Sequence, residues 1–66
     1  MTVDEFVNEM IRVFRKAGIE CADAEAMQLA CHILSCRQSW LYTHKDDEMD
    51  DKVLLASAAL INERCK

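Results

Sequence analysis

Six side chains of this 66-residue sequence have the chemistry of metal ligands, or of a nucleophile and its base. They are four cysteines and two histidines: Cys21, Cys31, His32, Cys36, His44 and Cys65. Cys31 and Cys36 lie five positions apart, on an expected helix and its exit, and the remaining cysteines and His44 lie on separate elements, so spacing does not support a zinc site. Cys31 and His32 are helix neighbours whose side chains point about 100° apart, so they do not form a catalytic pair. We therefore expect thiols packed in a core, with no metal, no cofactor and no catalytic residue; a scattered three-cysteine, two-histidine site is the alternative.

A run of carboxylates is the second chemical candidate. Its members are Asp46, Asp47, Glu48, Asp50 and Asp51. A calcium loop of the EF-hand type needs a glycine at its sharp turn, and this run contains none. We expect a solvated loop that supplies Asp50 as the N-cap of the next helix and Asp51 to its first turn.

An aromatic segment supplies the candidate partner contacts. They are Arg37, Trp40, Tyr42 and His44. Trp and Tyr bury a large area and keep a polar group, so they serve both cores and interfaces. Trp40 is the only tryptophan of a small chain, and a place in the core is the favoured interpretation. An exposed Trp40 would instead be the first binding hot spot, with Arg37 beside it.

Helices are expected to position these side chains, because one Gly and no Pro leave few residues for the turns of a sheet. Residues 3–17 carry apolar side chains at three- and four-residue spacing, begin with a capping box of Thr2 and Glu5, and end at Gly18. Further helices are predicted over residues 24–34, with Asp23 as N-cap and the inner place in the bundle, over 37–43 and over 51–64. The sequence thus predicts an all-α fold, a single-domain bundle of four to five helices spanning residues 1–66.

The last of these helices is nearly all apolar between Val53 and Ile61. Leu54, Ala58, Ile61 and Cys65 form one stripe, which leaves apolar residues for a second face. That second face is expected to touch the first helix, a second copy of the chain, or a domain outside it. A homodimer through the segment from Val53 to Ile61 is therefore one of three alternatives.

The overall charge bounds the kind of partner. A formal net charge of −4 disfavours binding to a phosphate backbone, so we expect no direct nucleic-acid contact and a basic protein surface as the better match. The N-terminus is acidic, so we expect no signal peptide there, and the longest apolar run is shorter than the about 20 residues that span a bilayer. We expect a cytoplasmic protein with reduced thiols and no membrane contact.

Several short motifs, taken in order, resemble the N-terminal helical domain of the HemK/PrmC-type release-factor glutamine methyltransferases. The matching residues are Ala17-Gly18-Ile19-Glu20, Glu25-Ala26, Leu29, His32-Ile33-Leu34, Arg37, Trp40-Leu41-Tyr42, His44-Lys45-Asp46 with Met49, and a basic residue at Arg64. Each motif alone is weak, and the ordered set covers nearly the whole chain. Lys45 stands where the family often has Pro, which implies a looser turn.

The resemblance implies a substrate-docking domain whose partner is a release factor or the catalytic domain of such an enzyme. The chain holds neither the Gly-rich turn for S-adenosylmethionine nor the Asn-Pro-Pro-Tyr motif of the family, so we expect it to be non-catalytic alone, and no catalytic residue carries over. The alternative is a free-standing small acidic helical protein, phage- or plasmid-borne, that inhibits or adapts a host complex.

Overall fold

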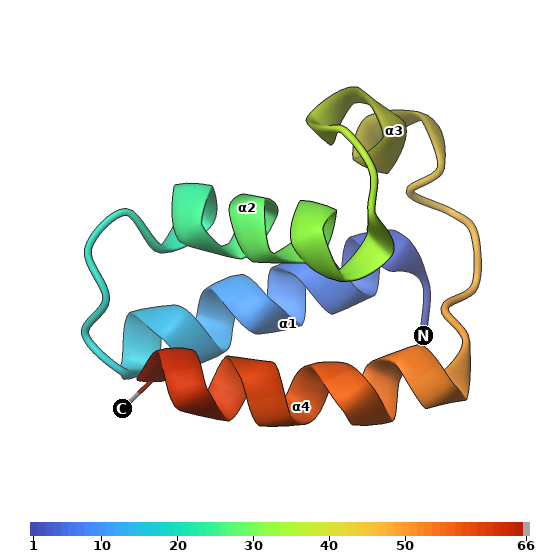
Figure 1. Cartoon of the computed structure of the whole chain (residues 1–66). Coiled ribbons are helices and arrows are strands. Elements are labelled where there is room, and N and C mark those ends of the chain that lie inside the picture. Colours follow the sequence, from blue (N-terminus) through green and yellow to red (C-terminus); the bar gives the residue numbers. More distant parts are fainter. Residues whose placement is uncertain (66) are drawn as a thin grey trace.

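The computed structural model describes residues 1–65, and this part of the chain folds into four helices (Figure 1). They are α1 (Val3–Lys16), α2 (Ala22–Leu34), α3 (Gln38–Thr43) and α4 (Asp51–Cys65). The prediction of a small all-α bundle is confirmed. The predicted boundaries agree with the observed ones to within two residues.

The central helix is α1. It contacts the other three helices, with α2 and α4 on different sides of it and α3 at the end where α2 stops and α1 starts (Figure 1). The largest fully buried side chains include Phe14 and Met10 of α1, whereas α2 buries only three alanines: Ala22, Ala26 and Ala30. The expectation that the second helix occupies the inner place was therefore wrong. Small residues let α2 approach α1 closely, and the large apolar side chains come from α1 itself.

Helix α1 has the properties that its sequence predicts at both ends. The Thr2 hydroxyl accepts the Glu5 N–H at 3.2 Å, and the Glu5 carboxylate accepts the Thr2 N–H at 3.0 Å. At the other end Gly18 adopts a left-handed conformation with φ +79°, and the N–H groups of Gly18 and Ile19 each donate to a carbonyl of the last turn. These bonds satisfy backbone groups that a helix end otherwise leaves without partners.

Helix α2 begins earlier than predicted. Its first residue is Ala22, preceded by Cys21 in the left-handed region with φ 55°, so Asp23 lies in the first turn and is not the N-cap. The helix is two residues longer at its start than predicted, and Ala22 is buried in the core. The Asp23 carboxylate contacts the Arg15 guanidinium at 3.0 Å, and this pair joins the end of α1 to the start of α2.

The acidic turn between α3 and α4 has exposed side chains, as predicted, but its backbone is fixed. Val3 N–H donates to the Asp47 carbonyl at 2.8 Å, and Asp4 N–H donates to the Lys45 carbonyl at 2.9 Å. The first N–H groups of α1 are thereby capped by a segment more than 40 residues away in the chain. The turn that follows α3 is held against the start of the central helix, and Lys45 in the family's Pro position takes part through its carbonyl.

Helix α4 packs more thinly. Asp50 caps it as predicted, its carboxylate accepting the Lys52 N–H at 2.9 Å. The one fully buried residue of α4 is Ser57, 2% exposed, whose hydroxyl donates to the Leu54 carbonyl. Ala58, which the predicted stripe included, is exposed, so the inward face is rotated toward Ser57. Leu55 on the outer side is 76% exposed, and the predicted second apolar face remains open.

Candidate functional site

Three of the four predicted contact residues lie together at one end of the molecule. Arg37 precedes α3, Trp40 lies within it and His44 follows it, and all three line a groove of about 510 Å³. The Trp40 and His44 rings are stacked, with centroids 4.3 Å apart and planes 14° from parallel. We call Arg37, Trp40 and His44 the Trp40 surface. The other residues that line this groove are Leu34, Ser35, Cys36, Ser39 and Thr43.

Trp40 lies between the two alternatives that the sequence left open, since it is neither fully buried nor fully exposed. It is half-buried and packs against the core, yet one side lies at the groove, where His44 covers part of it. His44 Nδ1 lies 3.1 Å from the Trp40 carbonyl. A carbonyl oxygen only accepts, so Nδ1 carries the proton of this contact and fixes the ring beside Trp40. The stack is therefore held by backbone geometry before any partner arrives.

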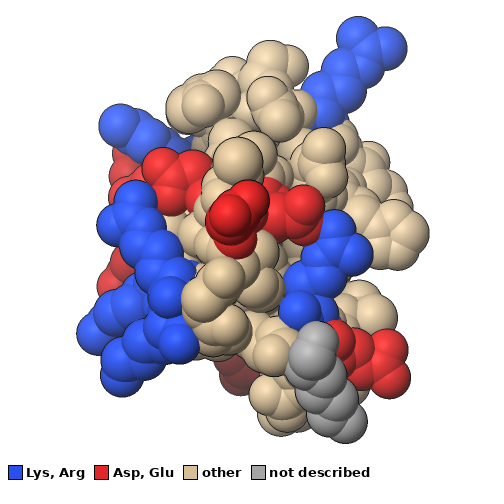
Figure 2. Space-filling view, turned by 90° about the vertical axis from the view of Figure 1, so that its left-hand side faces the viewer, with Lys and Arg blue, Asp and Glu red and all other residues tan. Residues whose placement is uncertain are grey.

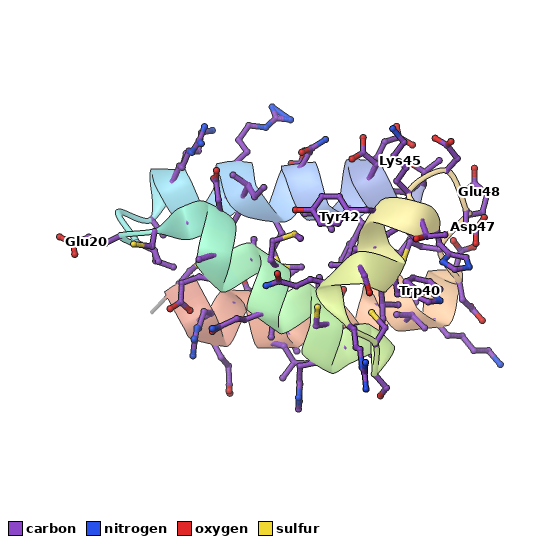
Figure 3. The ribbon with its side chains drawn as sticks, turned by 90° about the horizontal axis from the view of Figure 1, so that it is seen from above. Glu20, Trp40, Tyr42, Lys45, Asp47 and Glu48 are labelled. Carbon is purple, nitrogen blue, oxygen red and sulfur yellow. The ribbon has the colours of Figure 1, made fainter. Side chains whose placement is uncertain are left out.

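Tyr42 belongs to a different surface. Trp40 and Tyr42 are two positions apart on a helix, which places their side chains about 200° apart. Figure 3 shows Tyr42 on the side of α3 toward α1 and Trp40 on the other side. Tyr42 is 68% exposed and borders a groove of about 250 Å³ with an apolar floor that includes Val7 and Met27. The four predicted contacts thus divide between two surfaces, a consequence of helical spacing that the sequence alone could have given.

Carboxylates of the acidic turn lie at the same end of the molecule as Trp40. Figure 3 places Asp47 and Glu48 at the same end of the molecule as Trp40. The Glu48 carboxylate lies 2.9 Å from the amino group of Met1, and its hydrogen bond and charge raise the pKa of that amino group. Asp46 and Asp47 are exposed and make no ion pair within the described residues. These carboxylates therefore give negative charge to the surface at this end of the molecule.

The four cysteines are free thiols; Cys21 is exposed and the other three are partly buried. Within residues 1–65, no three His, Cys, Asp or Glu side chains come together in a group that could hold a metal ion. Burial raises the pKa of the Cys36 thiol, and the neighbouring Cys31 raises it further. A raised pKa keeps the thiol protonated and therefore weakly nucleophilic. His32 is exposed on α2, away from His44.

Three of the seven Lys and Arg side chains among residues 1–65 form ion pairs with carboxylates: Arg12, Arg15 and Arg64. Figure 2, which views the end with the turn between α1 and α2, shows several Lys and Arg along its left edge and others on its right-hand side, with Asp and Glu among them. Arg12 pairs with Glu9 at 2.7 Å, and Arg64, the basic residue of the resemblance, pairs with Glu25. None of the helices within residues 1–65 is both long and apolar enough to pass through a membrane.

A comparison with protein families shows the family to which this chain belongs. The family model described as the PrmC N-terminal domain matches residues 5–66. The chain belongs to the PrmC N-terminal domain family. No curated protein and no solved structure matches it. The resemblance drawn from short motifs is thus confirmed, and in this PrmC N-terminal domain the motif around Gly18 forms the turn that closes α1.

Proposed function

We propose that this chain docks a peptide chain release factor through the Trp40 surface and does not transfer a methyl group by itself. The observation that carries the proposal is the Trp40–His44 stack at the edge of an open groove, with Arg37 on the same groove. Membership of the PrmC N-terminal domain family supplies the class of partner.

The chemistry of the Trp40 surface fits an interaction hot spot. Trp and Arg are the side chains most enriched at such spots, because both offer a large flat contact with a polar edge. His44 and the core hold Trp40 in one orientation, so little conformational entropy is lost when a partner binds. The carboxylates of the acidic turn, at the same end of the molecule, would attract basic groups of the release factor that flank an apolar side chain bound at Trp40.

We place methyl transfer in the catalytic domain that the family carries. A catalytic role for this domain would need a nucleophile, a base and an orienting group within reach of one another. Two observations support the non-catalytic assignment. The Cys36 thiol has a raised pKa, and the His44 ring already binds a backbone carbonyl. The domain then contributes by holding the substrate protein near the chemistry.

The test is calorimetric titration of the chain with a purified release factor. Arg37→Ala removes an exposed side chain that makes no ion pair among the described residues, so the fold is retained and we expect at least a tenfold loss of affinity. Trp40→Phe keeps apolar volume in the core and should also weaken binding. The matched control is Leu55→Ser on α4, which should bind as the unaltered chain does.

Two results would overturn the proposal. One is the absence of release-factor binding at millimolar concentration; the other is equal affinity for the Arg37→Ala, Trp40→Phe and control variants. Binding of a different basic protein complex by the same residues would favour the inhibitor or adaptor alternative. Tyr42→Ala decides whether the groove beside α1 takes part, since that change leaves the Trp40 surface intact.

A further inference from the structure

The outer face of α4 has an ordered composition that the packing of this chain does not use. Its side chains are Lys52, Leu55, Ala56, Ala59, Leu60 and Glu63, all exposed. At 100° per residue, the two charged residues and the two alanines fall within an arc of about 60°, and the leucines flank them on either side. This arc points away from the side on which Ser57 is buried against α1.

The order of these residues is symmetric about the midpoint of residues 57 and 58. Consider an antiparallel pair of α4 helices related by a two-fold axis at that midpoint. Three pairs of residues from the two copies then lie at the same height along the helices: Lys52 with Glu63, Leu55 with Leu60, and Ala56 with Ala59. Each match occurs twice, because a two-fold interface uses the same surface on both copies. From this register we propose that the outer face of α4 binds a second copy of the chain in an antiparallel α4–α4 contact.

The charges of this face favour a second copy of the chain as its partner, with the two α4 helices antiparallel. Neither Lys52 nor Glu63 pairs with another of the described residues, so both are available to a second copy. In the antiparallel register a cation meets a carboxylate at each end, whereas a parallel pair would set Lys52 beside Lys52 and Glu63 beside Glu63. Like charges placed opposite each other at an interface are unfavourable, so the parallel arrangement is disfavoured.

Shape supports the same register. Ala56 and Ala59 at the centre let two helix backbones approach closely. Beside them runs a groove of about 360 Å³ between α2 and α4, whose α4 lining includes Val53, Ala56 and Leu60. Leu60 of the second copy lies level with Leu55 and on the side of this groove, so it can insert there. Leu55, 76% exposed, and Leu60, 42% exposed, supply the apolar area to be buried.

The size of the contact sets its strength. A helix of 15 residues is about 22 Å long, which is too short to bury the roughly 800 Å² per partner of a standard interface. We therefore expect a weak dimer that forms at high micromolar to millimolar concentration. The contact uses the outer face of α4, and the groove beside it shares no lining residue with the groove of the Trp40 surface.

Sedimentation equilibrium over a wide concentration range tests the proposal. The unaltered chain should rise from 7.6 kDa toward twice that mass. Lys52→Glu and Glu63→Lys each place like charges opposite each other at both ends, so each should weaken association at least tenfold. The double variant restores the opposite charges and should regain the affinity of the unaltered chain. Leu55→Ser removes apolar contact area without touching the core and should abolish the dimer.

Two outcomes overturn the proposal. A chain that stays at the monomer mass up to millimolar concentration has no such dimer. Association that the single charge reversals leave unchanged, or that the double reversal fails to restore, uses another register or another face. Circular dichroism of each variant confirms that the helices are intact, which the exposed positions of the substituted residues lead us to expect.

Discussion

Helices α1 and α4 have nearly the same length and differ in how they use apolar residues. α1 buries five of its fourteen residues on one stripe, and its opposite face is charged. α4 buries one of its fifteen, a serine, and carries leucines on the inward and outward faces. α1 is also capped by its own capping box and by the acidic turn, whereas α4 is capped at its start by Asp50 alone among the contacts described.

The difference separates two uses of hydrophobic residues. A single apolar stripe is satisfied within one chain, since burying it completes the core. A helix with apolar side chains on two faces buries one face and leaves the other exposed, and exposed apolar patches commonly mark interaction sites. The α1 stripe therefore accounts for stability, and the outer face of α4 is the surface that we propose binds a second copy of the chain.

The largest expected effect is on the free energy of unfolding, when one large apolar residue in each of the two helices is replaced by alanine. Met10→Ala in α1 removes a side chain that is 1% exposed and should cost about 2–5 kcal/mol of unfolding free energy, enough to unfold much of a domain this small. Leu55→Ala in α4 should change it by no more than about 0.5 kcal/mol. Urea unfolding followed by circular dichroism measures both. Equal losses would mean that the outer face of α4 is part of the folded core.

The next effect is the stability lost when the N-cap side chain of α1 or of α4 is removed. Thr2→Ala removes the hydroxyl that accepts the Glu5 N–H, and we expect a loss of about 1 kcal/mol. Asp50→Ala removes the equivalent acceptor at α4, with an expected loss of about 0.5 kcal/mol because only the end of a thinly packed helix frays. Hydrogen exchange of the two first turns distinguishes them. A larger loss for Asp50→Ala would contradict the ranking.

A smaller effect concerns how helices end. α1 ends with Gly18 and α2 ends with Ser35, both left-handed and both with the same pair of backbone hydrogen bonds. Gly18→Ala should cost about 1 kcal/mol through conformation alone, since an added Cβ meets no atom within 4 Å. Ser35→Gly should stabilise by about 0.5 kcal/mol, because it relieves the left-handed conformation of a residue with a Cβ. Thermal unfolding of both variants shows whether the first change lowers stability and the second raises it.

The smallest effect is the pH dependence of the α1 cap. Hydrogen bonds from Thr2, first its backbone N–H and then its side chain, lower the pKa of Glu5. A lowered pKa in the folded state gives stability that is present above the unfolded pKa and is lost as the pH falls through the folded one. Glu5→Gln removes this dependence while keeping an acceptor. The stability difference between the unaltered chain and this variant should shrink as the pH falls below 4, and a constant difference would exclude the carboxylate as its source.

Sequence patterns sufficed where one local rule decided the structure. The capping box at Thr2, the apolar stripe of α1 and the left-handed Gly18 each involve residues within a few positions of one another, and each was predicted. The start of α2 was misplaced because Cys21 adopts a left-handed conformation that residues other than glycine rarely adopt, and no local signal marks it. The central place of α1 was missed because α2 reads as apolar all round, although its buried side chains are alanines.

The candidate site was predicted in part. Arg37, Trp40 and His44 were named from their chemistry, and the structure groups them on one groove. The capping of α1 by carbonyls of the acidic turn could not be predicted, because it joins Val3 to Asp47 through backbone atoms that carry no sequence signal. The separation of Tyr42 from Trp40 was available from the 100° rotation per residue.

The most direct test of the docking role uses Trp40 itself. It is the only tryptophan of the chain, so 5-fluorotryptophan labelling gives one fluorine signal, and an unlabelled release factor adds none. We expect this signal to shift or broaden as release factor is added, and we expect Arg37→Ala to reduce the change. An unchanged fluorine signal at release-factor concentrations that calorimetry shows to saturate the chain would place the contact elsewhere and contradict the account.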